Sequence, residues 1–159
     1  MNRANNLRDL GAHREAEALY ATAQDLFDAL PDSEAVRSNY ALLYMNRANN
    51  LNNLGAHLEA EVHYAAAQDL FDALPDSEAV RSDRALVRMN RAHNLRSLGA
   101  HSEAEVHHAA AQDLFDALPD SEAVRTNRAR VRMYRASNLQ GLGAHSEAEV
   151  HHAAAQDLF

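Results

Sequence analysis

The chain repeats itself every 44 residues, and this period constrains its fold more than any other feature. Copies begin at Met1, Met45 and Met89, and a partial fourth copy begins at Met133 in a chain of 159 residues. The first two copies agree at 34 of 44 positions, and the second and third agree at 36 of 44. A period of about 20 to 50 residues is typical of solenoids and other arrays of small structural units. We therefore expect one repeat domain over residues 1–159, with copies at 1–44, 45–88, 89–132 and 133–159.

Each copy contains two helix breakers. A glycine always follows a leucine, and a proline always lies in Leu-Pro-Asp-Ser; these residues are Gly11, Gly55, Gly99 and Gly143, and Pro31, Pro75 and Pro119. The segments between them are rich in alanine and other good helix formers and contain few β-branched residues. Each copy is therefore expected to form two helices joined by short connections.

The third hairpin illustrates the expected boundaries. The pattern predicts a first helix over Ser77–Leu98 and a second over His101–Leu118. Pro75 disfavours helical geometry at the residue before it, and Asp76 or Ser77 is suited to cap the helix that follows. Gly99 suits the left-handed position that ends the first helix.

The apolar residues of each helix follow one face. In the second helix they are spaced by four, three, four and three, at Ala60, Tyr64, Ala67, Phe71 and Leu74. In the first helix Ala41, Met45, Ala48 and Leu51 form a similar stripe, which Leu54 is expected to close. One hairpin cannot cover such a face alone, so neighbouring copies must do so. We predict an all-α fold, a right-handed α-solenoid of stacked antiparallel helical hairpins with about eight helices.

The spacing of these residues resembles the tetratricopeptide-repeat family. The matching stretch runs Ala48-x-x-Leu51-x-x-Leu54-Gly55-x-x-x-Glu59-Ala60-x-x-x-Tyr64-x-x-Ala67-x-x-Leu70. This resemblance implies a superhelix whose concave surface receives extended or helical peptides. The chain departs from the family in its period, which is 44 residues rather than about 34. It also has arginine at positions 47, 91 and 135, where the family has a core leucine.

A stripe of variable residues along the first helices is the candidate peptide-binding groove, because the resemblance places it near the concave surface. Its polar members would form hydrogen bonds with a peptide backbone. They are Asn46, Asn49 and Asn53 in one copy, Asn90, His93 and Ser97 in the next, and Arg130, Tyr134 and Ser137 in the last. The alternative is that these positions are exposed and have drifted between copies.

Arginines and asparagines also recur at equivalent positions of successive copies, and each such set of equivalent residues is called a column below. Two arginine stripes, at 81, 84, 88 and 91 and at 125, 128, 132 and 135, would either bind an acidic peptide or a phosphate-bearing ligand or pair with the acids of the second helices. We favour pairing. The invariant Asn6, Asn50, Asn94 and Asn138 lie beside the apolar stripe, and we expect them to form hydrogen bonds between layers.

Ten histidines raise the question of a metal site. His101 and His108 share a helix face but lie two turns apart, about 10 Å, which is too far for one ion. His108 and His152 replace Tyr20 and Tyr64 on the apolar stripe, which favours a packing role. We therefore predict no metal site, although titration of these columns near pH 6 would loosen the stack.

Composition removes several functional classes. The absence of cysteine excludes thiol catalysis and cysteine-ligated zinc, and a net charge of −8 disfavours a general nucleic-acid binder. No apolar run reaches the roughly 18 residues of a membrane span, and Met1 leads into no secretory segment. No nucleophile elbow, phosphate loop or paired carboxylates are present. We expect a cytoplasmic, non-enzymatic protein without cofactor, nucleic-acid or membrane partners.

Two main functions remain, beside a weaker third in which the histidine columns sense a metal or pH. The preferred prediction is a protein–protein interaction scaffold that binds a peptide or helix of unknown identity along the inner face of the first helices. The alternative is a self-assembling structural module that associates through uncapped ends, as a head-to-tail homo-oligomer. Four residues would lie at those ends: Leu7, Leu10, Leu158 and Phe159.

Overall fold

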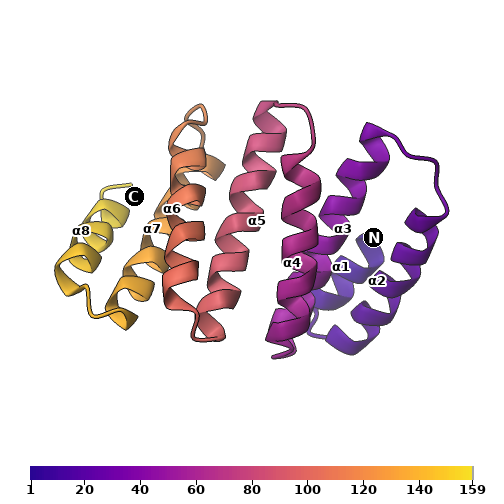
Figure 1. The fold of residues 1–159 in the computed structure, drawn as a ribbon, viewed down its shortest axis with the longest axis horizontal. Coiled ribbons are helices and arrows are strands. Elements are labelled where there is room, and N and C mark those ends of the chain that lie inside the picture. Colours follow the sequence, from indigo (N-terminus) through magenta and orange to yellow (C-terminus); the bar gives the residue numbers. More distant parts are fainter. Residues whose placement is uncertain (159) are drawn as a thin grey trace. The chain divides into compact units, whose positions relative to one another are not determined.

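The computed structural model describes residues 1–158 and contains eight α-helices and no strand in that part of the chain (Figure 1). The helices are α1 (Asn2–Asp9), α2 (His13–Asp28), α3 (Glu34–Asn53), α4 (His57–Asp72), α5 (Glu78–Ser97), α6 (His101–Asp116), α7 (Glu122–Gly141) and α8 (His145–Gln156). Each pair, α1/α2 to α7/α8, is an antiparallel hairpin whose two helices pack against each other. The predicted all-α array of helical hairpins is confirmed.

The long first helices begin at a serine cap. The Ser77 hydroxyl accepts a hydrogen bond from the Val80 backbone N–H at 3.2 Å, and Ser33 and Ser121 cap α3 and α7 in the same way. A serine oxygen at this position satisfies an N–H that the helix itself leaves unpaired. Of the two residues predicted to cap α5, it is Ser77 that does so.

The turn inside each hairpin depends on glycine. Gly55 has φ +77°, a left-handed conformation that an L side chain rarely adopts. The Ala56 N–H then donates to the Leu51 carbonyl at 2.9 Å, and the Gly55 N–H donates to the Asn52 carbonyl at 3.0 Å. These two bonds form the Schellman motif that ends a helix, and they recur at the other three turns.

The predicted boundaries are close to the observed ones. Helix α5 covers Glu78–Ser97, within one residue of the prediction at each end. Helix α6 ends at Asp116, two residues before the predicted end, because the Leu118 N–H turns back to the Phe115 carbonyl at 3.2 Å. Leu118 nevertheless keeps its side chain in the core.

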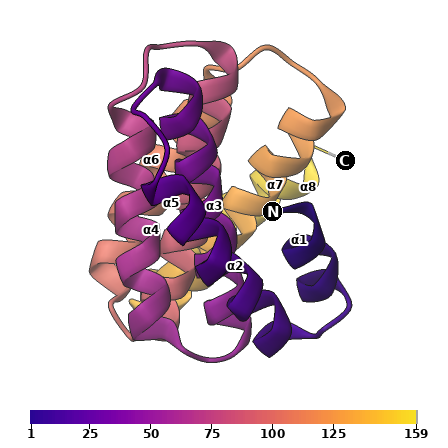
Figure 2. The ribbon, with the colours of Figure 1, turned by 90° about the vertical axis from the view of Figure 1, so that its right-hand side faces the viewer.

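The helices form two compact units, Met1–Pro75 with α1 to α4 and Asp76–Phe159 with α5 to α8. In the first unit α2 packs against α3, and this contact joins its two hairpins (Figure 2). In the second unit α6 packs against α7 in the same way, and the first helices α5 and α7 also touch. Each unit is therefore a stack of two hairpins.

The predicted apolar stripes are buried in the first unit, with one exception. The four stripe residues of α4 and Leu74, which follows that helix, lie in the core, as do Ala41, Met45, Ala48 and Leu51 of α3. The expectation that Leu54 closes the α3 stripe is wrong, because its side chain is 40% exposed. Leu54 is the residue at which α3 ends, and it lines a surface pocket beside the start of α2 instead.

The second unit repeats this core. Met89 of α5 and Phe115 of α6 are completely buried together with Val131 of α7. Leu118 and the partly buried Tyr134 extend the same cluster. Among the helices that the structure describes, none combines the length and the apolar character needed to cross a membrane.

Candidate interaction surfaces

In the first unit, the stripe predicted to bind a peptide is partly engaged by the protein itself. Asn49 Oδ1 accepts a hydrogen bond from the Tyr64 hydroxyl at 2.6 Å. Asn46 Oδ1 accepts one from Arg8 Nη1 at 3.3 Å. Asn53 is exposed. The first two amides therefore join α3 to neighbouring helices, α1 and α4.

In the second unit, the stripe is continuous across two helices. The His93 ring on α5 and the Tyr134 ring on α7 have centroids 5.0 Å apart, with an interplanar angle of 32°. The Ser97 hydroxyl donates to the His93 carbonyl at 3.3 Å. Arg130 is exposed at one end, whereas Asn90 and Ser137 are half-buried. The ring contact thus joins the stripe residues of α5 and α7 into one surface.

Arg47, at the position where the resembled family has leucine, belongs to a polar network between hairpins of the first unit. Arg47 Nε donates to Glu17 Oε1 at 2.6 Å, and Arg47 Nη1 donates to the Gln24 side-chain oxygen. Asn50 is completely buried; its amide nitrogen donates to the His13 carbonyl at 2.9 Å, and its amide oxygen faces His13 Nδ1 at 3.0 Å. The network joins α2 to α3.

The second unit contains the same network 88 positions later along the sequence. Arg135 on α7 forms an ion pair with Glu105 on α6 and donates to Gln112 Oε1 at 3.1 Å. Asn138 Nδ2 donates to the His101 carbonyl at 2.9 Å. The favoured prediction that the arginines pair with acids of the second helices is confirmed here, and Asn50 and Asn138 form the interlayer hydrogen bonds expected of them.

Other arginines of the last stripe also pair within the second unit. Arg132 Nη2 contacts both oxygens of Asp116, at 3.0 and 2.9 Å. Arg128 Nη1 donates to Asp120 at 3.1 Å, and its Nη2 donates to the Leu118 carbonyl at 2.8 Å. These two guanidinium groups on α7 bind the end of α6 and the segment that connects the two helices.

A buried polar pair differs between copies of the repeat. The Tyr20 hydroxyl donates to Asn5 Oδ1 at 2.5 Å, as Tyr64 does to Asn49. At the equivalent positions the third copy has two histidines, His108 and His93. The packing role predicted for His108 is confirmed, because its side chain is completely buried and lies 6.2 Å from the Tyr134 ring, centroid to centroid.

His108 carries an uncompensated polar group in this core. Neither of its ring nitrogens has a hydrogen-bond partner among the residues that the structure describes. Burial, together with the nearby positive charges of His93, Arg96, Arg135 and His107, lowers the pKa of His108 to about 3. The pairing of His93 with His108 was not predicted from the sequence, although the fifth and twentieth residues of the repeat change together in the third copy.

The residues predicted at the ends of the array differ in exposure. Leu7 packs against the core of the first unit, whereas Leu10 is 82% exposed. Leu158 is half-buried, and Phe159 lies outside the described residues. In residues 1–158, no group of three or more His, Asp or Glu side chains is arranged to hold a metal ion.

The hairpins, their turns and the repeated polar network define an all-helical array of repeats. No family model matches the chain, and no curated protein matches it. Among solved structures, it is similar to the crystal structure of BtubC (BKLC) from P. vanneervenii, with a TM-score of 0.62 and 15% sequence identity. The match covers 98% of this chain and 76% of that chain. At this identity the similarity concerns the fold alone.

Proposed function

We propose that the protein is a non-catalytic, cytoplasmic interaction scaffold, built from tetratricopeptide-like hairpins, that binds a peptide or helix along the stripe on its first helices. The His93–Tyr134 contact is the main support, because it joins the stripe residues of α5 and α7 into one surface. Along this surface the exposed Arg130 guanidinium and the Asn90 amide offer hydrogen-bond donors to peptide carbonyls. The Tyr134 ring offers apolar area to a side chain of the ligand.

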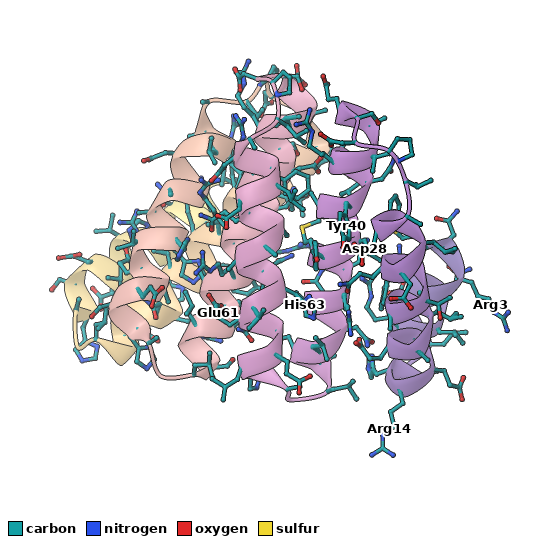
Figure 3. All side chains as sticks on the ribbon, turned by 45° about the vertical axis from the view of Figure 1, so that its right-hand side comes forward. Arg3, Arg14, Asp28, Tyr40, Glu61 and His63 are labelled. Carbon is teal, nitrogen blue, oxygen red and sulfur yellow. The ribbon has the colours of Figure 1, made fainter. Side chains whose placement is uncertain are left out.

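A peptide-array screen followed by titration of the selected peptide tests this proposal. Arg130→Glu reverses a charge on the exposed end of the stripe and is expected to weaken binding at least tenfold. Arg14→Glu makes the same charge change on α2, where the side chain points away from the helices (Figure 3), and is expected to leave affinity unchanged. Equal affinity of both variants and the unaltered protein would remove the stripe as the binding surface.

Asn49 and His93 are poor choices for this test. Asn49→Ala deletes the hydrogen bond to Tyr64 as well as any contact with a ligand, and His93→Ala deletes the ring contact with Tyr134. A loss of binding in either variant would therefore mix stability with recognition. Arg130 avoids this difficulty because its side chain is exposed.

A self-assembling structural module is the second candidate function. One observation favours it: helices α1 and α8 each expose side chains whose counterparts in other copies are partnered between hairpins. The two candidates are separable, because the stripe and these side chains occupy different positions of the repeat.

A further inference from the structure

One polar network joins consecutive hairpins in both units. It uses five positions of the repeat: a histidine, a glutamate and a glutamine from a second helix, and an arginine and an asparagine from the following first helix. In the first unit they are His13, Glu17, Gln24, Arg47 and Asn50, and in the second they are His101, Glu105, Gln112, Arg135 and Asn138. Because the network occurs twice, we regard its two halves, one on a second helix and one on the following first helix, as complementary surfaces.

Helix α8 displays the second-helix half of this network. Its equivalent residues are His145, Glu149 and Gln156, and all three are exposed. The corresponding carboxylates in the two complete networks, Glu17 and Glu105, have side chains only 23% and 19% exposed. Helix α8 therefore presents an acceptor set on its surface that elsewhere in the chain binds an arginine and an asparagine.

Helix α1 displays the first-helix half. Arg3 and Asn6 occupy the positions of Arg47 and Asn50, and both are exposed, whereas Asn50 is completely buried. In Figure 3 the Arg3 side chain projects away from the helices. The interlayer hydrogen bond expected for Asn6 is therefore not made within its unit. Arg3 and Asn6 have the same spacing as Arg47 and Asn50, so α1 carries the donor types that this network pairs with the residue types found on α8.

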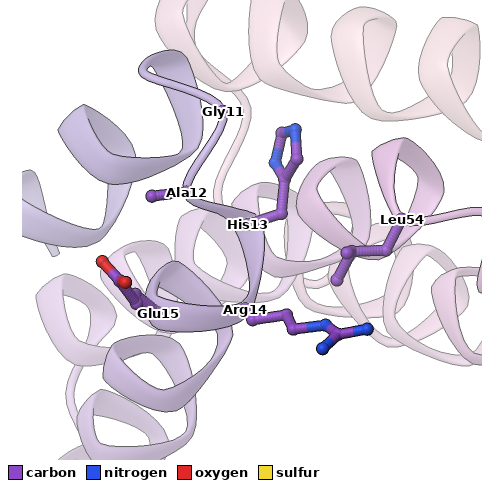
Figure 4. A pocket seen from close by; sticks show the side chains of 6 residues that line it. All are labelled: Gly11, Ala12, His13, Arg14, Glu15 and Leu54. Carbon is purple, nitrogen blue, oxygen red and sulfur yellow. The ribbon is translucent and has the colours of Figure 1, made fainter.

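An apolar contact between hairpins also has an exposed counterpart beside α1. Leu54 borders a pocket of about 310 Å³ whose other walls are Gly11 to Glu15, at the turn of the preceding hairpin (Figure 4). Leu54 and its counterpart Leu142 are 40% and 43% exposed, whereas the equivalent Leu10, directly after α1, is 82% exposed. The turn that would receive Leu10, at residues 143–147, follows α7. Leu10 thus has the largest exposed apolar area of its column.

We infer that α1 of one molecule docks on α8 of a second copy and reproduces the network between hairpins. Arg3 would bind Glu149 and Gln156, and Asn6 would bind the His145 carbonyl and Glu149. The inference rests on the second candidate function, self-assembly, and names its partner as another copy of this chain. Because the two surfaces differ, the contact is heterologous and each bound molecule leaves a further surface available.

The contact should be weak and sensitive to salt. Helix α1 has 8 residues, whereas α3 has 20, so the docked surface is smaller than an interface between hairpins. A small interface in which an exposed ion pair takes part gives modest affinity, and salt screens that pair. We therefore expect reversible growth in mean mass between about 10 µM and 1 mM protein that diminishes when ionic strength is raised.

Charge reversal gives a specific test by sedimentation velocity and light scattering. Arg3→Glu alone and Glu149→Arg alone should each remain monomeric at concentrations where the unaltered protein associates, because each places like charges on both sides of the contact. A 1:1 mixture of the two variants should associate again, because every contact between unlike variants in an alternating assembly pairs one acidic with one basic side chain. Arg14→Glu is the matched control, and circular dichroism should report an unchanged fold in every variant.

Several results would overturn the inference. The unaltered protein could remain a monomer at 1 mM, the single variants could associate as it does, or their mixture could fail to associate. Self-association that persists in both single variants would point to another surface or to a different occupant. Because Arg130 is outside the network, Arg130→Glu should change peptide binding and not self-association. Failure of the self-association inference can therefore be distinguished from failure of the peptide-binding proposal.

Discussion

At the residue scale, the third copy of the repeat exchanges a tyrosine–asparagine pair for two histidines. The Tyr64 hydroxyl forms a hydrogen bond with Asn49, whereas His108 is buried without a partner for either ring nitrogen in the described part of the chain. An unsatisfied buried polar group costs about 1 to 3 kcal/mol. The charged form of His108 is disfavoured further, because burial and the positive charges of the nearby Arg96 and Arg135 oppose protonation of the ring.

His108 therefore makes stability depend on pH in a defined window. Its pKa is about 3 in the folded chain and about 6.5 when unfolded, so the unfolded state binds the proton more readily. The free energy of unfolding is therefore highest above pH 6.5, and it decreases progressively as the pH falls from 6.5 towards 3. Between pH 7 and pH 5 we expect the free energy of unfolding to fall by about 2 kcal/mol, measured by urea denaturation.

The chain supplies its own control for this effect. The double substitution His93→Asn and His108→Tyr restores the pair found in the first two copies. It should raise stability at pH 7 and abolish most of the fall between pH 7 and pH 5. If the double variant lost as much stability as the unaltered protein over that window, other histidines, such as His63 or His107, would be responsible.

At the element scale, the caps and turns follow from local sequence, whereas the contacts between hairpins do not. The Leu-Pro-Asp-Ser and Leu-Gly segments predict where each helix starts and stops because capping involves only neighbouring residues. The exposure of Leu54 and the pairing of Arg47 with Glu17 depend on a second hairpin. Sequence spacing indicated which residues lie on one face, but the register of one hairpin on the next determines which atoms meet.

The invariant asparagines allow one contact between hairpins to be measured. Asn50→Ala and Asn138→Ala each remove a buried amide that donates to a backbone carbonyl at 2.9 Å, so each should lower the free energy of unfolding by about 1 to 3 kcal/mol. Asn6→Ala changes the exposed copy and should alter stability by less than about 0.5 kcal/mol. Urea denaturation at a protein concentration that keeps the chain monomeric measures all three. Equal losses in the three variants would show that burial of the amide is not the cause.

At the scale of the whole molecule, each hairpin depends on its neighbour for much of its core. Met45 and Met89 are 7% and 0% exposed, whereas the equivalent Met133 is 50% exposed. The residues that cover Met89 include Phe115 and Leu118 on α6 and Val131 on α7. Burial of an apolar side chain in a repeat array is thus a property of the stack rather than of the individual hairpin.

Extending the array should therefore stabilise it. Adding one further copy of the 44-residue repeat after Phe159 is expected to bury Met133 and to raise the melting temperature, because it adds one hairpin and one interface between hairpins. Differential scanning calorimetry on the extended and original chains measures the change. A control extension in which the arginine and asparagine of the added network are alanine should give a smaller increase, and an unchanged melting temperature for both would contradict the nearest-neighbour account.

The sequence by itself determined the period, the helices, their ends and the faces that they bury, because each of these depends on residues within about one turn of each other or on a strict repeat. The tertiary structure decided which polar groups are partnered: Arg47 with Glu17, Asn50 with the His13 backbone, and His108 with none in the described residues. These outcomes depend on distances of a few ångströms between helices far apart in sequence. The same comparison of equivalent positions reveals the exposed halves of the network on α1 and α8, which the sequence alone does not distinguish from their buried counterparts.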